Sequence, residues 1–501
     1  MSASVPLTDI RDFKLHIAGE WQTGTGERRQ VRSPATGTLI ATVTEATDHD
    51  VAAACDAAAA AFPAWAATDT AERARLLRGL ARIIAERMDG LAELESAVTG
   101  RPIREMRAQM GRIPEWLDYF AGIILGLEGE ANRVKGGFLT YTQYRPYGVC
   151  ALLTPWNHPV LILVKKLAAA LAAGNTLVIK PSELAPVSPL LIAQWAREAG
   201  LPAGAVNVVT GGATAGAALV NNPQVARIDL TGGTTTGKRV AAAAAERLVP
   251  CTLELGGKTP VVIFADSQLD EAVAGALFSA FVAAGQTCVS GSRFLVEDSI
   301  YPQFIAKLTE RVKRLKIGDP ALPDTDIGPV ISAASRDRCF AFIAETKADG
   351  ARLLVGGERP ALSSNLSDGF FVPPTVFADV TPKMRLFRDE VFGPVVSVTP
   401  FRDEEHALAL ANDSDFALGA AIWSRDIIRA HRVAGKIRAG VTWINDHHKN
   451  DPRSIWGGYD MSGYGKENGW DALKSYLTKS SVVVRTEAQF SDWFAGGHRY
   501  G

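Results

Sequence analysis

Residues 150–183 read "CALLTPWNHPVLILVKKLAAALAAGNTLVIKPSE" and contain a strand, a helix and a second strand in succession. Residues 150–156 and 176–180 are short apolar runs, and the segment between them is rich in the helix formers Leu, Ala and Lys. Gly174 ends this segment, as glycine often does at the end of a helix. Short apolar strands that alternate with helices are typical of a parallel, doubly wound sheet.

The same alternation continues toward the C-terminus. Further strands, separated by helical segments, are expected at 205–212, 226–233 and 252–257. A second α/β series runs from 260–266 to 439–445. Ligands of doubly wound sheets bind beyond the C-terminal ends of the strands, so we expect the functional residues there.

The flanking segments differ from these two series. Residues 47–130 are rich in Ala, Leu, Arg and Glu and are predicted to be helical. Residues 136–149 alternate β-branched and aromatic residues with polar ones, which indicates an exposed strand or hairpin. The tail segment 479–486 predicts one more strand, with no obvious local partner.

The composition limits the classes of function. The chain has 501 residues and a formal net charge of −1, so it can hold two or three domains but offers no basic surface for nucleic acid or an anionic membrane. Its 5 cysteines are scattered without a CxxC pair, which disfavours disulfides and a metal site. The first residues resemble no signal peptide, and no apolar run reaches the length of a membrane span. We expect a cytoplasmic protein.

A glycine-rich turn, "LTGGTTTGKRV", follows the strand at 226–233. Gly232, Gly237 and Lys238 fit part of a phosphate loop, but Arg239 stands where that loop needs Ser or Thr. A strand, glycine turn and helix in this order still suit a bound diphosphate, because the free N–H groups of the helix start face the turn. A tight turn that merely needs glycine is the alternative.

Four further residues stand out at or near strand or helix ends. Lys180 and Glu183 could bind the hydroxyls of a ribose, in which case the carboxylate would favour NAD over NADP; an ordinary surface ion pair is the alternative. Glu254 lies at the end of an apolar strand and is either a general base or half of a salt bridge. Cys288 lies in a "GQTC" turn and, taken alone, would be a buried core thiol.

Seven motifs together resemble, in their order and spacing, those of the NAD(P)-dependent aldehyde dehydrogenase superfamily. The motifs are "TPWN" (154–157), "KPSE" (180–183), "TGGTTTG" (231–237), "LELGGK" (253–258), "GQTC" (285–288), "EVFGP" (390–394) and "SGYGKENG" (462–469). The resemblance covers roughly residues 14–485 and makes a buried, inert Cys288 improbable.

The resemblance implies roles for individual residues. Cys288 matches the nucleophile, Asn157 the oxyanion donor and Glu254 the general base that activates water. Glu467 matches a carboxylate credited with proton relay. The residues expected to bind NAD are Pro155, Trp156, Lys180, Glu183, Gly212, Gly232, Gly233, Gly237, Leu255, Glu390 and Phe392.

The resemblance also implies an aldehyde dehydrogenase-like fold with two doubly wound α/β domains. The NAD-binding domain would take 1–125 and 146–257, and the catalytic domain 258–460. Residues 126–145 and 461–501 would form an oligomerisation element and a C-terminal tail, because exposed strand edges need covering. We expect a homodimer or a homotetramer.

The substrate tunnel departs from the pattern of relatives that oxidise apolar aldehydes. His158 and Lys165 stand where such relatives often have aromatic residues, and the loop 445–458 is polar. The residues expected along the tunnel are His158, Lys165, His447, His448, Lys449, Asn450 and Trp456. They predict a polar, semialdehyde or ring aldehyde; in the alternative, Lys165 and Lys449 point to solvent or pair with Asp446 and Asp451.

Two other functions remain open for a chain of this fold. A CoA-acylating relative would release its thioester to CoA, but such relatives commonly lack the base that Glu254 matches. A non-catalytic protein that only binds the cofactor would not need Cys288, Asn157 and Glu254 together. The leading prediction is therefore NAD-dependent oxidation of an aldehyde to a carboxylate.

Overall fold

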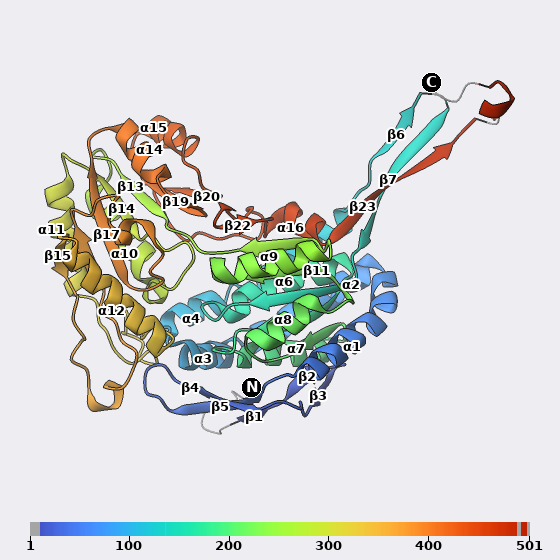
Figure 1. The fold of residues 1–501 in the computed structure, drawn as a ribbon, viewed down its shortest axis with the longest axis horizontal. Helices are drawn as coiled ribbons and strands as arrows, with labels where there is room; N and C mark the ends of the chain where they lie inside the picture. Colours follow the sequence, from blue (N-terminus) through green and yellow to red (C-terminus); the bar gives the residue numbers. More distant parts are fainter. Residues whose placement is uncertain (1–10, 136, 488–491, 498–501) are drawn as a thin grey trace.

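The computed structural model describes residues 11–135, 137–487 and 492–497. Its body consists of two α/β domains side by side, and a narrow sheet projects from one of them (Figure 1). This is the mixed α/β architecture with parallel sheets that the sequence predicts.

The first domain is built on an eight-stranded sheet with the order β22-β12-β11-β8-β9-β10-β2-β3. Its strands are β2 Leu15–Ile17, β3 Glu20–Gln22, β8 Val149–Thr154, β9 Thr176–Pro181, β10 Val206–Val208, β11 Val225–Thr231, β12 Cys251–Glu254 and β22 Gly463–Tyr464. The five strands from β12 to β10 are parallel, and the outer pairings are antiparallel. The predicted strands between 150 and 257 all fall in this parallel core.

Helices cover both faces of the first sheet. One face carries α1 Asp48–Ala67, α8 Ala213–Asn221 and α9 Thr234–Glu246, and the other face carries α2 Thr70–Glu86, α5 Ile113–Ile123, α6 Pro159–Ala173 and α7 Val187–Glu198. The remaining helices of this part of the chain are α3 Met88–Thr99 and α4 Ile103–Met110. Helix α6 is buried along almost its whole length and ends at Gly174, whose φ of 96° is left-handed.

The second domain is built on a seven-stranded sheet with the order β15-β16-β17-β14-β13-β19-β20. Its strands are β13 Pro260–Ile263, β14 Arg293–Glu297, β15 Arg352–Val355, β16 Thr375–Ala378, β17 Val395–Phe401, β19 Gly419–Trp423 and β20 Val441–Ile444. Its helices are α10 Leu269–Phe281, α11 Tyr301–Lys313, α12 Ala333–Ala348, α13 Arg385–Arg388, α14 Glu404–Asn412 and α15 Ile427–Ala434. All pairings except β15–β16 are parallel.

The projecting sheet joins two segments that are far apart in the sequence. Strand β7 Phe138–Pro146 pairs with β6 Ala131–Val134 on one side and with β23 Leu477–Arg485 on the other, both antiparallel. The tail strand that lacked a local partner therefore pairs with the predicted hairpin. Two small sheets complete the fold: β1 Arg11–Phe13, β4 Arg28–Arg32 and β5 Leu39–Thr44 form one, and β18 Phe416–Ala417 and β21 Tyr459–Asp460 the other.

The C-terminal boundary differs from the expectation. We expected residues 461–501 to belong with the projecting sheet, but β22 extends the first sheet next to β12. Helix α16 Gly469–Ser475 packs against α6, and its residues Ala472 and Leu473 lie in the core of the first domain. Strand β23 and the short helical turn Trp493–Ala495 lie away from the body (Figure 1). No helix in the described ranges is long and apolar enough to cross a membrane.

Candidate active site

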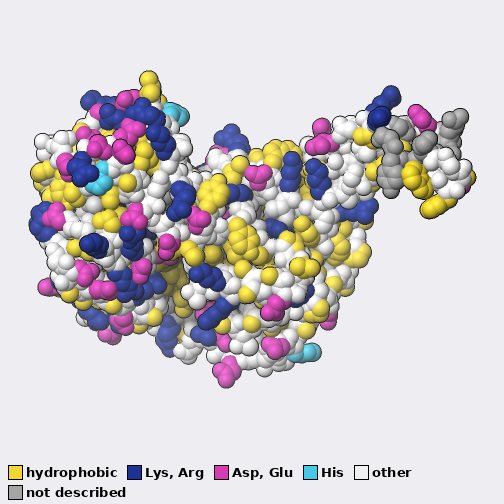
Figure 2. Space-filling model, turned by 45° about the horizontal axis from the view of Figure 1, so that its top comes forward, with side chains coloured by type: hydrophobic (Ala, Val, Ile, Leu, Met, Phe, Trp, Pro, Cys, Tyr) yellow, Lys and Arg dark blue, Asp and Glu magenta, His cyan; other side chains and the backbone are white. Residues whose placement is uncertain are grey.

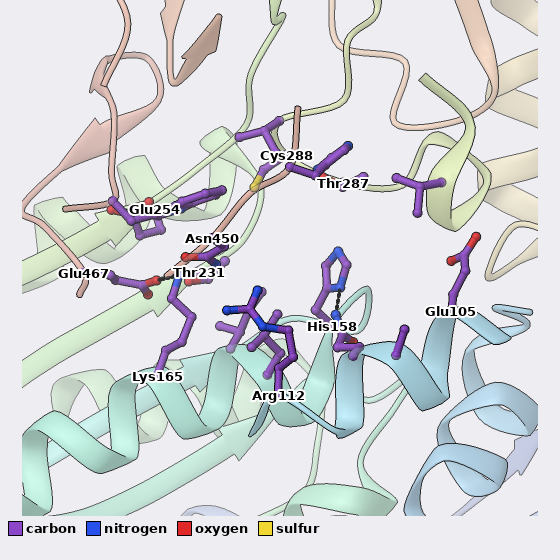
Figure 3. Close-up of a pocket in the computed structure, with 18 of the residues that line it drawn as sticks. Glu105, Arg112, His158, Lys165, Thr231, Glu254, Thr287, Cys288, Asn450 and Glu467 are labelled. Atoms are coloured by element: carbon purple, nitrogen blue, oxygen red, sulfur yellow. Dashed lines mark hydrogen bonds and ion pairs between the residues drawn. The ribbon is translucent and has the colours of Figure 1, made fainter. Parts of the chain in front are cut away.

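A cavity of about 290 Å³ lies where the two domains meet (Figure 3). The first domain contributes residues from α4, α5, α6 and the ends of β11 and β12, and the second contributes the loop after α10 and the segment 448–456. The lining residues that matter below are Arg101, Glu105, Gln109, Arg112, Trp116, His158, Lys165, Thr231, Glu254, Phe278, Cys288, His448, Asn450, Trp456 and Glu467.

Cys288 lies on an unusual loop between α10 and β14. The preceding residues Ala283, Ala284 and Gly285 have φ values of 53°, 51° and 72°, so three consecutive residues are left-handed. Left-handed alanines are costly and persist only where neighbours hold them. Here the Ala283 N–H donates to Glu105 Oε1 and Oε2, at 3.3 and 3.1 Å. The loop turns the Cys288 thiol toward the cavity (Figure 3).

The Cys288 thiol is neutral in this environment. Burial raises its pKa to about 12, and the carboxyl of Glu254 adds to that effect. Because the thiolate is the reactive form of cysteine, Cys288 needs a base close by before it can act as a nucleophile.

Asn157 follows β8 and faces the same loop from the first domain. Its Nδ2 donates to the Gln286 carbonyl at 2.9 Å, and its own carbonyl accepts from Arg101 Nη1 at 3.3 Å. The Asn157 amide is therefore held against the segment that carries Cys288. Its role as the oxyanion donor stays a prediction.

Glu254, the last residue of β12, is buried, and neither of its carboxyl oxygens has a hydrogen-bond partner among the described residues. Burial raises its pKa well above the ordinary range, and the nearby Glu467 raises it further. Gly457 lies directly against this carboxyl, where any added Cβ would collide with Oε1. The salt-bridge alternative for Glu254 is therefore wrong.

Glu467 is instead the carboxyl that is paired. Lys165 and Lys166 of α6 each contact one of its oxygens, at 2.5 Å, and Lys166 also pairs with Asp229 of β11. The two lysines overcome the effect of burial and lower the pKa of Glu467 to about 2. The two lysines thus hold this carboxyl in place, and its role in a proton relay stays a prediction.

The predicted tunnel residues divide into two groups. His158, Lys165, His448 and Trp456 line the cavity. His447 does not belong to the lining, contrary to the prediction, because its Nε2 is hydrogen-bonded to the Val289 carbonyl at 2.8 Å and its ring packs 4.7 Å from Trp443.

The alternative in which Lys165 points to solvent or pairs with Asp446 or Asp451 is wrong. Lys165 contacts Glu467 rather than Asp446 or Asp451, and its ammonium lies 4.7 Å from the centre of the Trp456 ring. Lys449 is exposed and lies outside the lining, whereas its neighbour Asn450 lines the cavity.

The residues expected to bind the cofactor surround the C-terminal ends of the parallel strands. Lys180 is buried, and its Nζ donates to the carbonyls of Pro181 at 2.7 Å and Gly211 at 2.9 Å, with the half-buried Glu183 on the following turn. Helix α9 begins after Gly233 without a side-chain cap. Space is open beside Gly212 and Gly233, since no atom lies within 4 Å of the position of an added Cβ.

The rest of this cofactor face is more closely packed. Gly237 lies against Leu255, so a Cβ there would collide with the leucine side chain. Glu390 Oε1 accepts from the Gly257 N–H at 2.9 Å, and burial raises the Glu390 pKa to about 7. Phe392, with a φ of 56°, meets the ring of Trp156 edge-on at 5.4 Å. An open glycine turn, a free helix N-terminus and flanking polar groups fit a dinucleotide.

The lining residues that were not predicted from the sequence include Arg101, Glu105, Gln109, Arg112 and Trp116. They lie on α4, α5 and the turns before these helices, in a segment that contains no motif. Only the packing of α4 and α5 against the start of α6 brings them to the cavity.

The cavity holds a thiol and a buried carboxyl without a partner among the described residues. It lies beside a strand–turn–helix of the kind that binds dinucleotides. Together these features define an oxidoreductase of the doubly wound α/β class. The comparisons with known proteins agree. The sequence matches the aldehyde dehydrogenase family over residues 21–482, and the chain belongs to this family. It is an enzyme of an NAD(P)-dependent family that oxidises aldehydes.

Several relatives can be named. The chain is 43% identical over 460 residues to a betaine aldehyde dehydrogenase of Brucella melitensis. The alignment covers 92% of this chain and 94% of the relative. The structure of PnpE from Pseudomonas sp. WBC-3 superposes with a TM-score of 0.94 at 41% identity and covers 97% of this chain and 100% of that chain. A betaine aldehyde dehydrogenase of Staphylococcus aureus in complex with NAD+ gives the same TM-score at 38% identity, with 96% of each chain covered.

Proposed function

We propose that this enzyme oxidises an aldehyde to a free carboxylate with NAD, through a covalent intermediate on Cys288. We further propose that its substrate is a polar aldehyde, such as a semialdehyde or a ring aldehyde. The observation that carries the proposal is the buried carboxyl of Glu254, which has no partner in the described chain and faces the same cavity as the Cys288 thiol.

The first step forms a bond between Cys288 Sγ and the carbonyl carbon of the aldehyde. The thiol proton passes to Glu254, whose raised pKa makes it a suitable acceptor. The carbonyl oxygen becomes an oxyanion, which the Asn157 amide and the Cys288 N–H stabilise by donating hydrogen bonds. Removing one such donor typically costs about 10²–10³ in rate.

NAD, when bound, supplies the acceptor for the hydride that the substrate carbon gives up. Lys180 and Glu183 would hold the adenosine ribose, the turn at Gly232 and Gly233 the diphosphate, and Glu390 the nicotinamide ribose. A carboxylate at Glu183 would repel a 2′-phosphate, so NAD is favoured over NADP.

The substrate is then a thioester on Cys288, and Glu254 acts a second time. Once it has returned its proton to solvent, its carboxylate takes a proton from a water molecule, and the hydroxyl attacks the thioester carbon. The C–S bond breaks, the carboxylic acid leaves and Cys288 recovers its proton. A base in this position supports hydrolysis rather than transfer to CoA.

The cavity supports a neutral polar or anionic substrate rather than a cationic one. Lys165 lies 4.7 Å from the centre of the Trp456 ring, and Arg112 lies 5.6 Å from that of Trp116. Aromatic faces are the usual binding site for quaternary ammonium groups, and here the protein's own cations occupy two of them. This arrangement disfavours the betaine aldehyde after which the Brucella and Staphylococcus relatives are named.

We also propose that the projecting sheet is an oligomerisation element of a homodimer or homotetramer. Among the described strands, β6 and β23 form the two outer edges of this sheet, and another subunit would cover such edges. Exposed apolar side chains on the nearby segment 459–470 add to this surface, namely Tyr459, Met461, Tyr464 and Trp470. Figure 2 shows hydrophobic side chains on the body between the second domain and the projecting sheet. Light scattering of the purified protein tests this proposal, and a monomer would contradict it.

The proposed reaction is tested with a panel of aldehydes assayed by NADH absorbance. The panel contains betaine aldehyde, hexanal, succinic semialdehyde and a hydroxybenzaldehyde, each with NAD or NADP and with or without CoA. We expect the polar aldehydes to be oxidised with NAD and without CoA. NADH formation that needs CoA would support the acylating alternative, and its absence with every aldehyde would contradict the proposal.

A further inference from the structure

His158 lines the same cavity as Cys288 and Glu254. It directly follows Asn157 and precedes the first residue of α6. Its ring lines the cavity and points toward the side on which Cys288 and Thr287 lie (Figure 3). Whether this ring donates or accepts a hydrogen bond there depends on which nitrogen carries the proton.

The contacts of Nδ1 decide that question. Nδ1 lies 2.8 Å from Arg101 Nη1 and 2.8 Å from Gln109 Nε2. An arginine has only donors and keeps its charge in proteins, so Nδ1 must be the acceptor. The Gln109 amide is oriented by the same guanidinium, because its Oε1 accepts from Arg101 Nη1 at 3.0 Å. Its Nε2 is therefore also a donor toward Nδ1 and shares the single lone pair of that atom with Arg101 Nη1.

The surroundings keep the ring neutral. The charged or titratable groups that face it are Arg101 from the turn before α4, Lys165 from α6 and His448 from the second domain. Burial lowers the pKa of His158 well below its ordinary value, and these three groups lower it further. A neutral ring with an occupied Nδ1 lone pair carries its proton on Nε2.

We infer that His158 is a fixed hydrogen-bond donor for an oxygen atom of the substrate near its aldehyde carbon, and that Arg101 and Gln109 are the residues that position it. This inference rests on the proposed function. It narrows the substrate to aldehydes with a neutral acceptor oxygen, such as a hydroxyl, ether or keto oxygen, a few bonds from the carbonyl. Arg101 is itself held by Glu105, with both Nε and Nη2 at 3.3 Å from Oε2.

The test compares two aldehydes of equal size, 3-methoxypropanal and pentanal, which differ by an ether oxygen in place of a methylene group. In the wild type, kcat/KM should be higher for the ether by about tenfold, the effect of one good hydrogen bond in a buried site. His158→Phe should abolish this preference, mainly by lowering kcat/KM for the ether. His158→Gln retains a donor and should keep part of the preference.

The wild-type preference should also stay constant between about pH 6 and pH 9, because the ring does not titrate there. A preference that survives in His158→Phe would overturn the inference. A wild-type preference for the ether that changes as the pH falls toward 6 would also overturn it. This second measurement needs no variant, so it does not depend on a variant folding. If the wild type oxidises neither aldehyde nor any other, the proposed function fails; if it oxidises both equally well with NAD, only this inference fails.

Discussion

Glu254→Gln should make the protein more stable while it removes most of the activity. The carboxyl is buried and lacks partners in the described chain. Leaving a buried polar group unsatisfied costs about 1–3 kcal/mol, and more when the group is charged. Glutamine has the same shape but no charge, so at pH 8 the variant should gain about 1–3 kcal/mol in the free energy of unfolding. For a domain of 150–250 residues this corresponds to an increase in Tm of about 2–12 °C.

The gain should depend on pH in a defined direction. A carboxyl whose pKa is raised by folding binds its proton more tightly in the folded chain than in the unfolded chain. Its contribution to stability is therefore fully present below the ordinary pKa of 4.5 and is lost as the pH rises through the folded value. The difference in Tm between variant and wild type should be near zero at pH 4.5 and grow toward pH 8.

Thermal unfolding between pH 4.5 and 8.5 measures this difference, with Glu358→Gln as the matched control on an exposed loop. Rapid mixing with NAD and substrate provides the second measurement. Glu254→Gln should slow both the first release of NADH, because Glu254 takes the thiol proton, and the steady state, because Glu254 also activates water. A variant less stable than the wild type at pH 8, or one whose first NADH release and steady-state rate both match the wild type, would refute the reasoning.

Three further predictions concern single side chains. Cys288→Ala should abolish aldehyde oxidation without changing Tm by more than about 1–2 °C, and substantial turnover in this variant would exclude Cys288 as the nucleophile. Glu183→Gln should raise kcat/KM with NADP relative to NAD by about tenfold, since it removes the charge facing the 2′-phosphate; an unchanged ratio would show that Glu183 does not contact the ribose. Lys165→Met frees the face of Trp456 and leaves Glu467 with one fewer cation. The ratio of kcat/KM for betaine aldehyde to that for succinic semialdehyde should therefore rise by about tenfold. An unchanged ratio would contradict the proposed selection against cationic substrates.

The fold could be read from the sequence because its strands are short apolar runs with clear helices between them. Strand β9, for example, was expected at 176–180 and is found at Thr176–Pro181. The fate of residues 461–476 could not be read in this way. Strand β22 has only two residues and joins the first sheet through its pairing with β12. No local sequence pattern predicts this pairing.

The site was predictable where a residue lies at a strand end and unpredictable where its role depends on a distant partner. Glu254 at the end of β12 belongs to the first kind. His447 and His448 belong to the second, since their rings lie 4.6 Å apart, yet His447 is hydrogen-bonded to the Val289 carbonyl and only His448 lines the cavity. Lys165 was expected in the cavity, but its sequence context does not show that Glu467 neutralises it.

That neutralisation changes where the charge of a substrate can be bound. Lys165 pairs with Glu467, and Arg101 pairs with Glu105. Of the carboxyls that line the cavity in the described chain, only Glu254 lacks a partner, and it lies on the side of the cavity occupied by Cys288. An anionic group close to the aldehyde carbon would face this carboxyl and be repelled whenever it is ionised.

An anionic group farther away meets a different residue. Arg112 lines the cavity, yet its side chain is 41% exposed and its Glu115 partner is 45% exposed. An exposed ion pair is worth little, so the guanidinium can exchange Glu115 for a substrate carboxylate at small cost. We therefore expect the neutral acceptor oxygen of the substrate to lie at His158 and any anionic group of the substrate to lie at Arg112. Lys165, which the sequence suggested as the cation for a substrate carboxylate, already forms an ion pair with Glu467.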